Sequence, residues 1–330
     1  MRAAFLSNDE EVTVMKKRFA LLLAALILCL SACASIAEEP TYRVGICQLV
    51  QHEALDAATL GFKDTLTALL GERVTFDEQN GSGDLSACYA IVNSFVSQDV
   101  DLILANATQA LQAARTATGE IPILGASVTD YPAALDMDEW NGVTGVNISG
   151  TSDLAPLDDQ AALIQELFPE VESVGLLYCS AEANSIYQVN AISDLLTDMG
   201  YRCTRYAFVD TNDVFSVTQS ACETSDVLYI PTDNVAASCA ELIRNVVEVE
   251  GVPVVAGDEG ICAGCGVATL CIDYYELGCA TGKMAYEVLV NGADVSTMPI
   301  GFAPSFSKKY NPELCESLGV VIPDGYEAIG

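Results

Sequence analysis

The chain has 330 residues with a formal net charge of −32, and 51% of them are hydrophobic. This length is enough for one large or two medium-sized domains with proper cores, and the hydrophobic content excludes a disordered chain. A surface this acidic repels phosphate backbones and anionic lipid headgroups, which argues against nucleic acid as a partner.

The first residues have the features of an export signal. Lys16, Lys17 and Arg18 precede the apolar run 19–30. This run is shorter than the roughly 20 residues that a membrane-spanning helix needs, and a basic segment before a short apolar run is typical of a signal peptide. A membrane anchor or a buried helix is the alternative interpretation.

The apolar run ends in Leu-Ser-Ala-Cys at 30–33, which resembles a bacterial lipobox. The lipobox implies that residues 1–32 are a signal peptide, that the thiol of Cys33 is lipidated after cleavage, and that residues 33–41 are a tether. A protein of this kind is held at the membrane through its lipid anchor and does not span it.

The segment 42–70 predicts a strand, a polar loop and an amphipathic helix. The strand corresponds to the apolar run from Val44 to Val50. In the helix, apolar residues recur at roughly helical spacing, namely at Ala58, Leu60, Phe62, Leu66, Leu69 and Leu70. Ligands of parallel α/β sheets bind at the carboxyl ends of the strands, so the first ligand contacts are expected in the loop 48–56.

The order of strand, loop and helix repeats along the chain. In the first half, strands are expected at 73–79, 101–105 and 121–126, helices at 85–98 and up to Thr118, and a crossing strand within 141–149. In the second half, strands are expected at 173–178, 202–209, 226–230, 252–257 and 266–272, and helices at 158–168, 214–222 and 275–290, with two more that end at Met199 and Glu248. Two such sets predict an α/β protein with two similar lobes and a ligand held between them.

Thirteen cysteines raise the question of disulfides or a metal site. Cys47, Cys179 and Cys271 lie in apparent strands, where a free cysteine behaves as a small buried hydrophobe. The odd count and scattered spacing argue against a complete disulfide framework. Cys262 and Cys265 form a C-x2-C pair, but no second pair or matching histidine follows, so we expect neither a metal nor a cofactor. Whether these two cysteines pair with each other stays open.

Eight segments resemble the bacterial ABC-transporter substrate-binding lipoproteins of the tryptophan/tyrosine type. In chain order they are VGICQLVQHEALDAATLGFKDTL, DLILANAT, PILGASVTD, NGVTGVNIS, LLYCSAEANS, VLYIPTDN, VPVVAGDEG and IDYYELG. The resemblance implies the periplasmic-binding-protein type I fold, in which two Rossmann-like lobes with parallel sheets are joined by a three-stranded hinge. Lobe 1 would comprise residues 42–147 plus 272–300, and lobe 2 residues 148–271 plus 301–330.

An amino-acid ligand needs donors for its carboxylate and acceptors for its ammonium group. Hydroxyl groups at helix N-termini can provide the donors, and the candidates are Thr108, Ser127, Thr129 and Ser185. The carboxylates that could accept from the ammonium group are Asp130, Glu182, Asp233 and Asp258. Ordinary helix capping is the alternative role for all of these side chains.

Four further side chains at strand ends are candidates for polar recognition, namely Asn184, Asn234, Gln48 and His52. The two asparagines offer both a donor and an acceptor, whereas Gln48 and His52 occupy the first loop. An aromatic ligand also needs a stacking wall, for which Tyr131, Tyr187 and Tyr274 are available.

The sequence predicts an extracytoplasmic solute-binding lipoprotein of an ABC importer. It would be lipid-anchored to the bacterial cell membrane, close around an aromatic or other hydrophobic amino acid, and dock on an ABC permease. The chain has no Gly-x-Ser-x-Gly elbow, no Walker A loop and a single histidine, so we do not expect an enzyme. Two alternatives stay open: a ligand-sensing lipoprotein of the same fold that signals to a membrane receptor, and a binding protein for a sugar or nucleoside.

Overall fold

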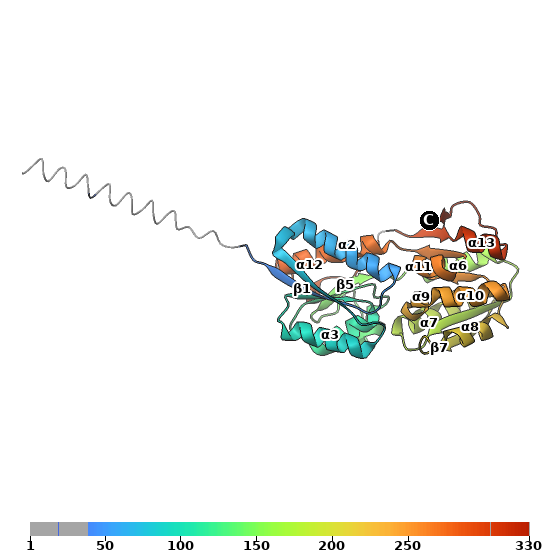
Figure 1. The fold of residues 1–330 in the computed structure, drawn as a ribbon, viewed down its shortest axis with the longest axis horizontal. Helices are drawn as coiled ribbons and strands as arrows, with labels where there is room; N and C mark the ends of the chain where they lie inside the picture. Colours follow the sequence, from blue (N-terminus) through green and yellow to red (C-terminus); the bar gives the residue numbers. More distant parts are fainter. Residues whose placement is uncertain (1–18, 20–38, 304, 330) are drawn as a thin grey trace, which may run out of the picture. The chain divides into compact units, whose positions relative to one another are not determined.

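Apolar strands that alternate with amphipathic helices form two α/β lobes in the computed structural model (Figure 1). The structure describes residue 19, residues 39–303 and residues 305–329. The predicted lipidation site Cys33 and, apart from residue 19, the predicted signal peptide 1–32 lie outside the described residues. Within those residues, no helix combines the length and the apolar character that crossing a membrane requires.

Lobe 1 is built on a six-stranded sheet with the order β11-β5-β4-β3-β1-β2. Its strands are β1 (Tyr42–Gln48), β2 (Val74–Asn80), β3 (Leu102–Asn106), β4 (Ile123–Ala126), β5 (Ile148–Ser152) and β11 (Gly301–Phe302). Its helices are α2 (Glu53–Leu70), α3 (Leu85–Ser97), α4 (Thr108–Ala117), α5 (Tyr131–Leu135) and α12 (Tyr274–Leu289), with short 3-10 turns η1 (Gly71–Arg73) and η2 (Val295–Thr297). All neighbouring strands in this sheet are parallel.

The alternation of side chains along β1 shows why this sheet is covered on both faces. Val44 and Ile46 belong to the same core cluster as apolar residues of α2 and α12. Gly45 faces the ring of Phe95 in α3, and Cys47 belongs to the core on that side. Because successive residues of a strand point to opposite faces, one continuous apolar run serves two helical layers.

Lobe 2 is built on a seven-stranded sheet with the order β13-β12-β10-β9-β8-β6-β7. Its strands are β6 (Ser173–Cys179), β7 (Arg202–Phe208), β8 (Val227–Ile230), β9 (Val254–Ala256), β10 (Ala268–Cys271), β12 (Ser307–Tyr310) and β13 (Glu327–Ala328). Its helices are α6 (Leu157–Leu167), α7 (Ala183–Asp198), α8 (Val214–Cys222), α9 (Asn234–Ser238), α10 (Ala240–Glu250), α11 (Glu259–Cys265) and α13 (Pro312–Leu318). The pair β10–β12 is antiparallel and the other pairs are parallel.

The chain crosses between the lobes three times: after β5, between β10 and α12, and between β11 and β12. β5 pairs with β4, and β11 pairs with β5, so both strands belong to lobe 1. The crossings therefore lie a few residues later than the expected boundaries at 147/148 and 300/301. The two lobes with mostly parallel sheets confirm the predicted fold class.

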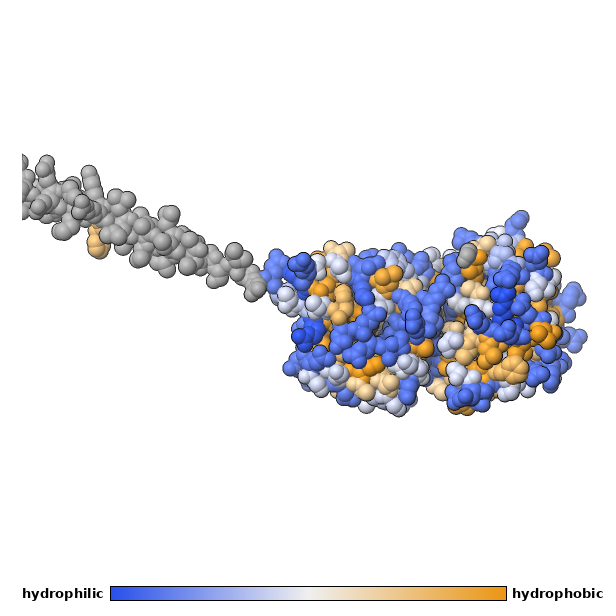
Figure 2. Space-filling view, in the orientation of Figure 1, coloured by the Kyte–Doolittle hydropathy of each residue, from blue (hydrophilic) through white to orange (hydrophobic). Residues whose placement is uncertain are grey.

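The expected helix that ends at Glu248 is divided into α9 and α10. The break lies at Cys239, where the hydroxyl of Ser238 donates to the carbonyl of Val235 at 2.8 Å. A serine that bonds back to the backbone competes with helical hydrogen bonding. Cys262 and Cys265 lie in α11, which was not predicted, and both are buried in the core of lobe 2. In the view of Figure 2, hydrophilic residues cover much of both lobes, and hydrophobic residues are also exposed, most visibly over lobe 2.

Candidate functional site

Loops at the carboxyl ends of strands in the two lobes contact each other. His52 follows β1, and its Nε2 lies 3.2 Å from Oδ1 of Asn234, which follows β8. Gln109, near the end of β3, donates from Nε2 to the carbonyl of Ala181 after β6 at 3.1 Å. The strand ends of both lobes therefore border one cleft, as expected for parallel α/β sheets.

Two hydroxyl groups at strand ends of lobe 1 are buried without a hydrogen-bond partner in the described chain. They are Oγ1 of Thr108, the first residue of α4, and Oγ of Ser127, the residue after β4. The ends of β3 and β4 are held side by side by a 2.9 Å bond from the Ala107 amide to the Ala126 carbonyl. The first amides of a helix also lack intrahelical acceptors, so this corner presents several donors.

The backbone at the same corner adopts conformations that are rare for residues with a side chain. Ala107 has φ 93° and Ser127 has φ 53°. Such residues cost about 1–3 kcal/mol each and cluster at ligand-binding sites. Here they place Thr108 and Ser127 at neighbouring strand ends.

Asp153 lies on the first crossing between the lobes and is 3% exposed. Its Oδ2 accepts from the Tyr274 hydroxyl at 3.0 Å, and the Thr129 side chain also bonds to it. Its Oδ1 has no partner in the described chain. Burial raises the pKa of Asp153 to about 6, although the bonds from Thr129 and Tyr274 act in the opposite direction.

The predicted carboxylate Glu182 is fully engaged within lobe 2. It accepts from the Asn184 side chain at 2.9 Å, from both the amide and the side chain of Asn234 at 3.2 and 2.7 Å, and from the amide of Val235 at 3.0 Å. It therefore joins the first turns of α7 and α9. Asn184 also donates to the Thr232 carbonyl and to Ser185, which leaves its buried Oδ1 without a partner in the described chain.

Helix capping, the alternative role stated above, is observed for three of the candidate carboxylates, namely Asp130, Asp233 and Asp258. They accept from the amides of Ala133, Ala236 and Ile261, respectively, each at 2.8 Å. Asp233 accepts a second amide, that of Cys179, at 2.6 Å, and its pKa is raised by burial and by the charge of Glu182. Burial, opposed by the capping bond, raises the pKa of Asp258 to about 7.

The side chain of Gln48 is held by hydrogen bonds within lobe 1. Its Nε2 donates to Asp56 at 2.6 Å and to the Val50 carbonyl at 2.9 Å, and its Oε1 accepts from Thr59 at 2.6 Å. These bonds occupy the side chain that was expected to contact ligand. His52 is half-buried, and burial lowers its pKa.

The three candidate tyrosines have different surroundings. Tyr131 is buried in the core of lobe 1, and its hydroxyl donates to the carbonyls of Gly125 and Thr151 at 3.2 Å. Tyr274 contacts Asp153 at the hinge. Tyr187 of lobe 2 is half-buried beside Asp130 of lobe 1, and burial and this carboxylate raise its pKa. Tyr187 is thus the candidate whose ring is not committed to a core or to the hinge.

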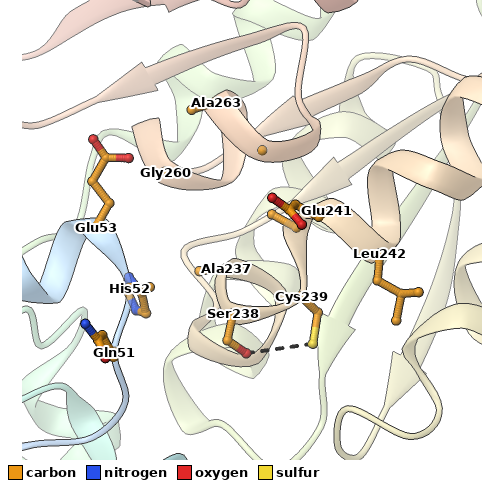
Figure 3. Close-up of a pocket in the computed structure, with 12 residues that line it drawn as sticks. Gln51, His52, Glu53, Ala237, Ser238, Cys239, Glu241, Leu242, Gly260 and Ala263 are labelled. Carbon is orange, nitrogen blue, oxygen red and sulfur yellow. Dashed lines mark hydrogen bonds between the residues drawn. The ribbon is translucent and has the colours of Figure 1, made fainter.

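Cavities open at the rim where the lobes approach each other. One of about 680 Å³ lies between residues 51–53 of lobe 1 and residues 237–242, 260, 263 and 264 of lobe 2. Figure 3 shows Gln51, His52 and Glu53 on one side, facing Ser238, Cys239 and Glu241 on the other. A second cavity, of about 230 Å³, is lined by Gln109, Glu182 and Asn234, among others.

Asp153 is the residue of this site that the sequence analysis missed. The crossing strand was expected within 141–149, whereas β5 extends to Ser152. Extending the strand through Gly150, Thr151 and Ser152 would have placed Asp153 at a strand end, like the other candidates. Within the described residues, no three His, Cys, Asp or Glu side chains are grouped so that they could hold a metal ion.

The comparisons with known proteins agree with this architecture. The family described as ABC transporter substrate binding protein matches residues 43–328. A tyrosine-binding protein of Clostridioides difficile (strain R20291) is 34% identical over 260 residues, which are 78% of this chain and 75% of that protein. An ABC domain from Streptococcus pneumonia, solved in complex with L-Trp, is 29% identical with a TM-score of 0.83, covering 88% of this chain and 100% of that chain.

A third relative differs in its state. The ligand-free, open structure of a Clostridium difficile substrate-binding protein with adhesive properties is 32% identical, covers 88% of this chain and 99% of that chain, and has a TM-score of 0.67. The TM-score is thus higher with the L-Trp complex than with the open, ligand-free structure.

These similarities confirm the type I periplasmic-binding-protein fold and the expected family. Members of this family bind small molecules outside the cytoplasm and work with ABC permeases, and their role is binding and not catalysis. The match along residues 43–328 leaves one assignment: the chain is a substrate-binding protein of the ABC-transporter substrate-binding family.

Proposed function

We propose that this protein binds an aromatic amino acid between its lobes and delivers it to an ABC importer, while a lipid on Cys33 tethers it to the cell membrane. The observation that supports the ligand class is a set of buried polar atoms without partners in the described chain: the hydroxyls of Thr108 and Ser127 and the oxygens of Asp153 and Asn184, all at or just after strand ends. Buried polar groups normally have partners, and a polar ligand in the cleft would supply them.

The lobe 1 corner suits the carboxylate of an amino acid. The hydroxyls of Thr108 and Ser127 and the first amides of α4 can donate to it, and the positive end of the helix dipole favours its charge. The aromatic side chain is inferred from the relatives, of which one is a tyrosine-binding protein and another was solved with L-Trp. Tyr187 is the ring that we assign to contact it.

Lobe closure is the mechanism that we infer. In the arrangement described here, His52–Asn234 and Gln109–Ala181 join the lobes directly. A ligand bonded to both lobes adds to these contacts and shifts the population towards the closed form, which the permease would recognise. The polar atoms of the ligand and of the cleft satisfy one another only when the lobes are closed.

The anchor rests on the lipobox at 30–33. Its test is metabolic labelling of cells with a radioactive fatty acid, comparing the wild type with Cys33→Ser. We expect label and membrane association in the wild type and neither in the variant. An unlabelled wild-type protein would argue against the anchor without affecting the ligand assignment.

The test of ligand class is a thermal-shift screen of residues 34–330 against the twenty amino acids, sugars and nucleosides. A ligand with micromolar affinity at millimolar concentration adds about 4 kcal/mol to the free energy of unfolding, which is easily detected. We expect shifts with L-Trp, L-Tyr or L-Phe. A shift with sugars or nucleosides alone would overturn the amino-acid assignment but leave the family unchanged.

A further inference from the structure

We propose that Asp153 is the seat of the ligand's ammonium group, so that the site requires a cationic amine. This rests on the proposed function, and it assigns the charge recognition to a residue on the crossing between the lobes. The candidates at the strand ends, Asp130, Glu182, Asp233 and Asp258, are assigned to a different task.

The first argument is the availability of acceptor oxygens. Glu182 accepts four hydrogen bonds from α7 and α9, and Asp233 accepts two backbone amides. Asp130 and Asp258 cap α5 and α11. Among the described residues, Oδ1 of Asp153 is the single buried carboxylate oxygen without a hydrogen-bond partner. An ammonium group provides three donors, and Oδ1 of Asp153 is a buried acceptor that one of these donors would satisfy.

The second argument is that, among the described residues, no positively charged side chain acts on the carboxyl group of Asp153. The titratable groups that face Asp153 are the hydroxyls of Tyr131 and Tyr274 and the carboxyl of Asp258. The ion pairs of Lys and Arg found in the described chain involve Glu78, Glu166, Glu248, Glu259 and Glu313 instead. A buried carboxylate without a cation is costly, and a bound ammonium group would remove that cost.

The third argument is position. Asp153 is bonded to Thr129 and Tyr274 of lobe 1, and the charge of Asp258 in lobe 2 acts on the same cluster. It thus lies where the two lobes meet, while the neighbouring strand ends of lobe 1 carry the hydroxyls of Thr108 and Ser127. The two charged groups of an amino acid would then bind at separate places. The carboxylate would lie at the donors of Thr108 and Ser127, and the ammonium group at the acceptor Asp153.

The test is calorimetric binding of L-Trp, L-Tyr and their analogues without the amino group, indole-3-propionate and 3-(4-hydroxyphenyl)propionate. The full mature chain is compared with Asp153→Asn and with Asp159→Asn, an exposed residue of α6 that serves as control. Asparagine keeps an oxygen that can accept from Tyr274, so the hinge contact is retained. We expect Asp153→Asn to weaken binding of the amino acids by roughly 30-fold or more and to abolish the preference for the amine.

The pH dependence is a second readout. Affinity of the wild type for L-Trp should fall as the pH drops below about 6, because Asp153 becomes protonated, whereas Asp153→Asn should lack this step. Unchanged affinity in Asp153→Asn, or equal loss of the amine and its analogue, would overturn the proposal. If the wild type binds non-aromatic amines through Asp153, the proposal holds and the aromatic assignment fails. If it binds no amine at all, both fail.

Discussion

At the scale of single residues, Thr108 and Ser127 have features that lower the stability of the fold and that a bound ligand would compensate. Each hydroxyl is buried without a partner in the described chain, and each follows or occupies a backbone position with positive φ. Packing within lobe 1 does not offset the cost of these features, because neither hydroxyl has a hydrogen-bond partner in the described chain. A ligand carboxylate bound there would compensate for this cost, since hydrogen bonds to a charged group are stronger than hydrogen bonds between neutral groups.

Replacing these hydroxyls should therefore weaken ligand binding without weakening the fold. We expect Thr108→Val or Ser127→Ala to raise the Kd of the amino acid by about 10- to 100-fold, as loss of a hydrogen bond to a charged group costs about 1.5–3 kcal/mol. Calorimetry measures the Kd, and thermal unfolding checks the fold. Thr269→Val is the matched control, because Oγ1 of Thr269 is also buried without a partner but lies in β10. Equal loss in the control would contradict the assignment.

The difference between predicted and observed site residues has a physical cause. Thr108 and Ser127 could be predicted because each follows a run of apolar residues that identifies the end of a strand. Asp153 could not, because β5 has the sequence ISGTS, and its small polar residues give no hydrophobic signal. Nor could the sequence show that the Gln48 side chain forms hydrogen bonds with Asp56 and Thr59, since such contacts exist only after α2 has packed.

At the scale of elements, periodicity was most informative for amphipathic helices and buried strands. The helix expected at 214–222 is α8, and the strand expected at 173–178 is β6 with one residue added. Short elements such as α5 and α11 were missed, because a helix of one or two turns carries too few residues for a periodic pattern. The break between α9 and α10 depends on a local bond of Ser238 that composition does not reveal.

The contact between α2 and α12 in lobe 1 depends on glycine. A Cβ on Gly278 would lie 2.0 Å from the Ala58 carbonyl oxygen, and one on Gly61 would lie 2.1 Å from that of Tyr275. In both cases the atom that the added Cβ would meet belongs to the backbone, so it cannot move aside by side-chain rotation. These positions hold α12, which enters lobe 1 from the hinge, against the helix that follows the first site loop.

Gly278→Ala should consequently destabilise the protein by about 1–3 kcal/mol or more, the usual cost of overpacking. Urea unfolding gives the free energy of unfolding. The control is Gly119→Ala, at an exposed turn with nothing within 4 Å of the added Cβ, where we expect no loss of stability. A Gly278→Ala protein as stable as the control would show that α2 and α12 can separate at little cost.

The loop after β1 and the helix α9 provide a direct link between the lobes. His52 and Asn234 should favour the closed form, as their bond of 3.2 Å is made only when the lobes approach. We expect His52→Ala to raise the Kd about 2- to 10-fold, because a smaller fraction of the protein is binding-competent.

A double-mutant cycle with Asn234→Ala tests this link. The two substitutions should be non-additive, since removing either partner already breaks the bond. The control is Asn93→Ala, whose side chain bonds within α3 to the Tyr89 carbonyl and should leave the Kd unchanged. Fully additive effects of His52→Ala and Asn234→Ala would mean that the bond does not contribute to closure.

At the scale of the whole molecule, the cleft collects buried acids in an already acidic chain. The carboxyl groups of Asp153, Asp233 and Asp258 have raised pKa values, to about 6 for Asp153 and about 7 for Asp258, with burial as the main cause in each. Between their unfolded pKa of 3.8 and these folded values, the folded protein binds more protons than the unfolded chain. Their contribution to stability is present below the unfolded pKa and is lost as the pH rises through the folded values.

Two groups, His52 and Cys88, act in the opposite direction because their pKa values are lowered, but they are outweighed. The pKa of His52 is lowered by burial, so its contribution is present above its unfolded pKa of 6.5 and is lost as the pH falls. The lowered pKa values of Glu166, Asp226, Glu248 and Asp294 affect stability only below the ordinary range of carboxyl groups. The three carboxyl groups with raised pKa values and the self-repulsion at a net charge of −32 outweigh His52 and Cys88, so stability falls as the pH rises.

The ligand-free protein should therefore lose stability as the pH rises from about 5 to about 8, by several degrees in Tm. Thermal unfolding across this range measures the slope. Asp258→Asn should flatten it, because asparagine can still cap α11 but does not titrate. Asp226→Asn should leave it unchanged, since the pKa of Asp226 is lowered by its bonds with Ser173 and lies outside this window. A saturating amino acid should also flatten the slope, because its ammonium group favours the ionised form of Asp153. Stability that increases from pH 5 to pH 8 would show that these acids are not buried together in the folded protein.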